Sequence, residues 1–90
     1  MKVNKQFVAK NIAGEIVIVP TGNAIRNFNG LISVNEVAGF IWTHLEECET
    51  PEDMIKMVLD EYEGDETKIR NEVTEFLDTL KKVGMIWYEE

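Results

Sequence analysis

The pattern of apolar and polar residues changes once along the chain, near Asn35. Before that point, Glu15–Val19 is a β-branched run of the kind that packs on a pleated sheet. The shorter segment Phe7–Ala9 precedes it, and Ala13–Gly14 lies between them, where glycine allows the backbone angles of a tight turn. The two segments are therefore predicted to form an antiparallel hairpin, which ends at the turn-forming run Pro20–Asn23.

A third extended segment is predicted at Gly30–Val34, directly after Asn29. The stretch between the hairpin and this segment, Asn23–Phe28, follows neither period and is interpreted as a loop. The first part of the chain thus predicts a three-stranded antiparallel sheet.

Three helices are predicted after the sheet, each with its own start signal. Asn35 can cap the first, Thr50 followed by Pro51 starts the second, and Asp65 can cap the third. Gly84 ends the third helix, and a short extended tail, Met85-Ile86-Trp87-Tyr88, follows it. The apolar faces comprise Val37, Ala38, Ile41 and Leu45 in the first helix, Met54, Ile55, Val58, Leu59 and Tyr62 in the second, and Ile69, Val73, Phe76, Leu80 and Val83 in the third.

Three strands followed by three helices predict an α+β, winged-helix-like fold, with an N-terminal three-stranded antiparallel sheet. The chain has 90 residues, so we expect one domain over residues 1–90. No run of apolar residues approaches the roughly 18 that a membrane span needs, and the polar N-terminus does not resemble a signal peptide. Cys48 is the only cysteine, which excludes an internal disulfide and favours a cytoplasmic setting.

Charge is distributed unevenly along the chain, whose formal net charge is −8. Residues 1–45 carry four basic and two acidic side chains, whereas residues 46–90 carry five basic and fifteen acidic ones. Nucleic-acid binding depends on Lys and Arg that neutralise phosphates, and the third helix has more acids than bases. The charge pattern therefore argues against a nucleic-acid partner.

Residues that could support catalysis are scarce. His44 is the only histidine, and with Cys48 it does not complete a set of metal ligands. The chain has neither a G-x-G-x-x-G motif nor a P-loop, and the acids near Glu52 are best explained as a solvated first helical turn. We therefore expect no enzyme activity, no metal and no cofactor.

A second line of residues runs along the third helix, beside its apolar face: Arg70, Thr74, Leu77 and Lys81. One basic residue on each side of an apolar residue could bind an extended peptide that carries apolar and acidic side chains. The neighbouring segment Leu31–Val34 would offer a sheet edge with unpaired backbone groups to such a peptide. The alternative is that Leu77 only broadens the core, with Arg70 and Lys81 in solvent.

The segment Phe28–Trp42, which reads FNGLISVNEVAGFIW, resembles the PqqD family of RiPP recognition elements. The resemblance extends over nearly the whole chain, with Pro20-Thr21-Gly22 before this segment and Gly84-Met85-Ile86 near the end. Val34 stands where the family usually has Leu, and Val37-Ala38 where many members have Thr-Gly or Thr-Ala.

This resemblance implies a domain that binds the leader region of a ribosomally made precursor peptide, as an added strand, for a modifying enzyme. Typical partner enzymes of the family are radical-SAM enzymes, and one branch serves the synthesis of pyrroloquinoline quinone. Carried over by position, the peptide-binding residues are Leu31, Ile32, Ser33 and Val34 on the strand and Arg70, Thr74, Leu77 and Lys81 on the helix.

The leading hypothesis is therefore a non-catalytic, cytoplasmic leader-peptide chaperone. The alternative is a winged-helix DNA-binding regulator, and a further one is a structural subunit that docks through Trp87-Tyr88. Because an open strand edge can also pair with a second copy, we expect a monomer or a weak homodimer.

Overall fold

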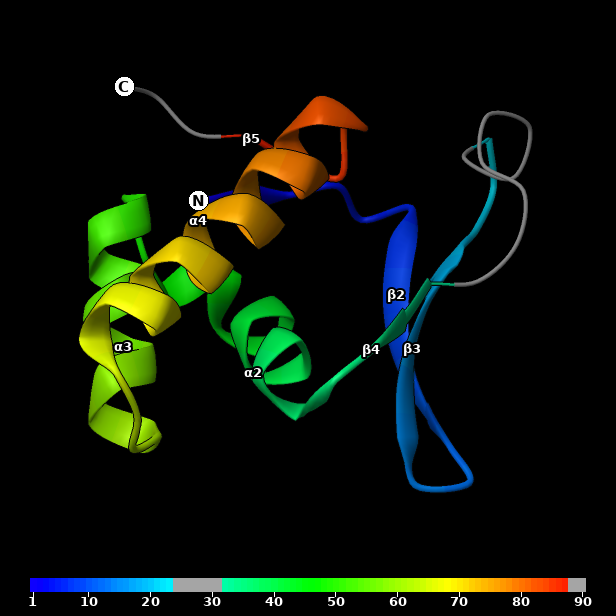
Figure 1. The fold of residues 1–90 in the computed structure, drawn as a ribbon. Coiled ribbons are helices and arrows are strands. Elements are labelled where there is room, and N and C mark those ends of the chain that lie inside the picture. Colours follow the sequence, from blue (N-terminus) through cyan, green and yellow to red (C-terminus); the bar gives the residue numbers. More distant parts are fainter. Residues whose placement is uncertain (24–31, 88–90) are drawn as a thin grey trace.

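The computed structural model describes residues 1–23 and 32–87, which form antiparallel sheets and three α-helices (Figure 1). In chain order the strands are β1 (Lys2–Val3), β2 (Phe7–Ile12), β3 (Glu15–Pro20), β4 (Ile32–Val34) and β5 (Ile86–Trp87). The helices are α2 (Glu36–His44), α3 (Pro51–Glu61) and α4 (Glu66–Lys82), and a short 3-10 turn, η1 (Leu45–Glu47), follows α2.

Strands β2, β3 and β4 form the predicted three-stranded antiparallel sheet, in that order. The β2–β3 hairpin turns at Ala13 and Gly14, whose φ angles of 53° and 83° are those of a tight two-residue turn. The backbone N–H of Gly14 donates to the side-chain oxygen of Asn11 at 3.1 Å and fixes the turn. Of the predicted third segment, β4 contains Ile32–Val34, whereas Gly30 and Leu31 lie outside the described residues, as does most of the predicted loop.

A second sheet, formed by β1 and β5, was not predicted. Lys2 pairs with Trp87 and Val3 with Ile86, so a segment near the start of the chain forms backbone pairs with a segment near its end. The prediction of one N-terminal sheet is therefore wrong in this respect. Met85 and Ile86 are buried beside α4, whereas Trp87 is half exposed and Tyr88 lies outside the described residues.

The three predicted helix starts are confirmed by their capping hydrogen bonds. Asn35 Oδ1 accepts from the Ala38 N–H at 2.8 Å, and Asp65 Oδ1 accepts from the Thr67 N–H at 2.8 Å. At α3, Thr50 and Asp53 form a reciprocal capping box, in which each side chain accepts a backbone N–H of the other residue at 3.2 Å.

The core lies where α4 crosses α2 and α3 (Figure 1). It contains Ile18 of β3 and buried residues of every α-helix: Ile41, Trp42, Met54, Ile55, Val58, Val73, Leu77 and Leu80. Val83, predicted to continue the apolar face of α4, is exposed instead. Helix α2 packs closely on β3, because a Cβ on Gly39 would lie 2.5 Å from Ile16 Cδ1. This close approach holds α2 against β3 at Ile16, which pairs with Val34 at the end of β4.

Candidate functional site

One edge of the three-stranded sheet is open at β4. Strand β4 pairs with β3 through Ile16–Val34, Val17–Ser33 and Ile18–Ile32, and it is the last strand in the sheet order. Along its other edge no strand of the described part of the chain pairs with it. Such an edge presents backbone N–H and C=O groups that can accept one more strand.

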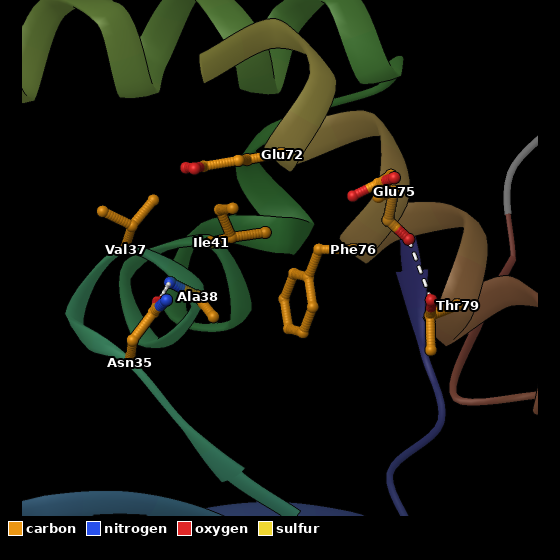
Figure 2. A pocket seen from close by; sticks show the side chains of 8 residues that line it. All are labelled: Asn35, Val37, Ala38, Ile41, Glu72, Glu75, Phe76 and Thr79. Carbon is orange, nitrogen blue, oxygen red and sulfur yellow. Dashed lines mark hydrogen bonds between the residues drawn. The ribbon is translucent and has the colours of Figure 1, made fainter. Parts of the chain in front are cut away.

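A groove of about 390 Å³ opens where β4 ends and lies between α2 and α4. Figure 2 shows the Phe76 ring reaching from α4 toward the first turns of α2. The lining residues are Asn35, Val37, Ala38 and Ile41 on one side and Glu72, Glu75, Phe76 and Thr79 on the other. Asn35 directly follows Val34, so the groove begins at the residue next to the end of β4.

The groove combines an apolar wall with acidic side chains. Phe76 is half-buried and Ile41 is buried, whereas Glu72 and Glu75 are exposed. The hydroxyl of Thr79 already donates a hydrogen bond to the backbone oxygen of Glu75 at 2.9 Å. The side-chain oxygen of Asn35 likewise already accepts the hydrogen bond that caps α2. The two carboxylates of α4 are therefore the charged groups of this lining.

The four predicted helix residues lie on the opposite side of α4 from the groove. Successive helix residues are rotated by about 100°, so Arg70 and Leu77 point away from the direction of Glu72 and Phe76. Leu77 is 1% exposed and packs in the core, and its contact with a peptide side chain stays a prediction. Thr74 and Lys81 are exposed, and their role in binding stays a prediction.

Arg70 is engaged by α3. Its Nη1 donates to Glu52 Oε2 at 2.7 Å, and its Nη2 lies 3.8 Å from Glu66 Oε2. The hydrogen bond from Arg70 lowers the pKa of Glu52 and raises the pKa of the Arg70 guanidinium. The Arg70 side chain thus links α4 to the start of α3, and the predicted pairing with a peptide acid would have to compete with this contact.

Replacing Arg70 by glutamine is expected to return the pKa of Glu52 toward its ordinary value, as measured by an NMR titration of the carboxyl group. The pKa of Glu52 is lower in the folded state than in the unfolded state. The ion pair therefore stabilises the fold at pH values above the ordinary carboxyl pKa, and this stabilisation is lost as the pH falls through the lowered pKa. Lys68→Gln serves as the control, because Lys68 is a neighbouring base without a contact to Glu52. An unchanged Glu52 titration in Arg70→Gln would contradict the α3 contact.

The sequence pattern does not single out the groove residues Glu72, Glu75 and Thr79, because Phe76 falls on the apolar face of α4 and is interpreted as a core residue. A signal was available: Phe76 lies at the edge of the apolar face of α4, where Glu72 and Thr79, four residues before and three after it, share its side of the helix. The sequence alone does not show whether another element packs against the flank of α4 that carries Arg70 or against the flank that carries Phe76.

The described residues contain no group of three or more His, Cys, Asp or Glu that could hold a metal ion. Cys48 is buried, and burial raises the pKa of its thiol. Among the helices that the structure describes, none is long and apolar enough to cross a lipid bilayer.

Comparison with known proteins gives one family and one structural neighbour. Residues 15–86 match the family model of coenzyme PQQ synthesis protein D (PqqD). The fold is similar to a solved structure described as TbiB1 in complex with the TbiA(beta) leader peptide, with a TM-score of 0.73, 23% identity and full coverage of both chains. A search of the curated proteins finds no match.

Proposed function

The chain belongs to the PqqD family, and on this premise we propose that it binds the leader region of a ribosomally synthesised precursor peptide and presents it to a modifying enzyme, without catalysing a reaction itself. The observation that carries the proposal is the open edge of β4 beside an apolar groove. An extended peptide that pairs with this edge would satisfy the backbone groups of β4 and place its side chains against α4.

The structural neighbour supports the same role. It has this fold over its full length and is described as a complex with a leader peptide. The order of strands and helices is interpreted as winged-helix-like, and a radical-SAM enzyme is the proposed class of partner.

For the binding surface, we propose the backbone of Ile32–Val34 together with the flank of α4 that faces α2, in place of the flank that carries Arg70. This choice follows from continuity, since the groove begins where β4 ends. It also follows from access, because Leu77 is buried and Arg70 is paired with Glu52.

Replacing Phe76 by alanine is expected to weaken peptide binding by about tenfold or more, because an aromatic side chain in a groove usually contributes strongly to affinity. The probe is the most enriched peptide from a random dodecapeptide phage library selected on the immobilised domain, and its affinity is measured by calorimetry. Thr74→Ala is the control, because Thr74 lies on the far flank of α4, and we expect its affinity to stay within about twofold. Phe76→Leu, which keeps an apolar side chain, should give an intermediate affinity.

A failure to enrich any peptide, or equal affinities of the Phe76→Ala and Thr74→Ala variants, would contradict the proposed site. Circular dichroism at the assay temperature confirms that each variant is folded. Duplex DNA of random sequence at low salt is the competing ligand, since a DNA-binding domain retains non-specific affinity there. Tighter binding of this DNA than of the selected peptide would favour the DNA-binding alternative.

A further inference from the structure

The acidic side chains of the groove have no partner in the described part of the chain. Neither Glu72 nor Glu75 forms a hydrogen bond or ion pair through its carboxylate, although other acids of the helices are engaged. Glu52 pairs with Arg70, Glu46 with Lys5, and Asp53 caps α3. The groove therefore presents two carboxylates that are available to a ligand.

Among the residues that the structure describes, no basic side chain lines this groove. Figure 2 shows Glu72 extending from α4 on the side of Val37, with the Phe76 ring between the two helices. A ligand in the groove thus meets the apolar surface of Phe76, Val37 and Ala38 and a local charge of one sign. The same sign dominates the protein, whose formal net charge is −8.

We propose that the groove selects extended peptides with a lysine or arginine side chain at the end of the added strand that lies beside Asn35. This inference rests on the proposed function and specifies the class of peptide. The long stem of a Lys or Arg side chain can pack on an apolar wall while its charged end stays near carboxylates. The face of the Phe76 ring adds a favourable interaction with a cation.

An acidic peptide side chain at this position would face two carboxylates, and like charges across an interface disfavour binding. The net negative charge also accelerates the approach of a cationic peptide more than that of an anionic one. The groove thus reverses the preference that the sequence suggested, in which Arg70 and Lys81 would pair with acidic peptide residues.

The test uses the peptide selected from the random dodecapeptide library, whose enriched sequences should share a Lys or Arg at one fixed position. Replacing that residue by Glu should weaken binding by at least about tenfold at low salt. The double variant Glu72→Gln/Glu75→Gln should weaken binding of the original peptide by about tenfold, and added salt should reduce this difference. The matched control Glu49→Gln/Asp60→Asn changes the net charge equally at exposed positions outside the groove, and its affinity should stay within about twofold of the unmodified domain.

A reversed pair gives the sharpest result: Glu72→Lys/Glu75→Lys should bind the Glu-containing peptide better than the Lys-containing one. If peptides bind β4 without a basic preference, and the groove variant equals its control, the inference is wrong and the proposed function stands. If no peptide binds, both are wrong. If the domain instead self-associates, and the selected peptide does not dissociate the dimer, the groove is an interface between two copies and the inference is also overturned.

Discussion

Replacing Leu77 by alanine is expected to lower the free energy of unfolding by about 2–5 kcal/mol, the usual cost of a large-to-small substitution in a packed core. Leu77 is 1% exposed and lies in the same cluster as Val73 and Leu80. A domain of this size has a total stability of roughly 5–13 kcal/mol, so the variant should be partly or largely unfolded at moderate denaturant concentrations. Urea unfolding followed by circular dichroism measures the difference.

Thr74→Ala provides the comparison for Leu77→Ala, since Thr74 is exposed one turn earlier on the same flank of α4. We expect its free energy of unfolding to change by less than about 0.5 kcal/mol, as is usual for a surface position. If Leu77→Ala kept its stability but lost peptide affinity, Leu77 would belong to the binding surface and the assignment of the flanks would be reversed.

The hairpin and the helix starts could be predicted because their signals are local. Ala13 and Gly14 mark the turn, and the reciprocal bonds of Thr50 and Asp53 involve residues only three positions apart. Each of these elements satisfies its own backbone groups with nearby side chains, so the sequence alone contains the relevant partners.

The β1–β5 sheet could not be predicted because its strands contain two residues each and lie at opposite ends of the chain. Two residues are too few to show an alternation of apolar and polar positions. The pairing of Lys2 with Trp87 depends on where α4 ends relative to β1, which is a property of the tertiary structure.

The choice between the two flanks of α4 was beyond the sequence for a similar reason. Both flanks border the same apolar face, and both carry charged residues at helical spacing. Arg70 is paired because α3 brings Glu52, 18 residues earlier, to its side of the helix. The flank of α4 that carries Phe76 forms one wall of a groove, because α2, which begins at the end of β4, forms the other wall.

Backbone pairing along the open edge of β4 is the central claim, and methylation of the peptide backbone tests it. In an added strand, N–H groups of alternate residues point toward the neighbouring strand. Two analogues of the selected peptide therefore suffice, one N-methylated at two alternate residues and the other at the two residues shifted by one position. Each lost hydrogen bond to a buried partner costs about 1–3 kcal/mol, and about 1.4 kcal/mol is a factor of ten in affinity.

The most direct measurement is a titration of both analogues into the ¹⁵N-labelled domain. We expect one analogue to bind within a few-fold of the parent peptide and to shift the amide signals of Ile32–Val34, and the other to lose about 100-fold in affinity and to leave these signals unchanged. Equal effects of the two analogues, or shifts confined to β1, β5 or the Arg70 flank of α4, would contradict the claim that the peptide is bound as a strand along β4.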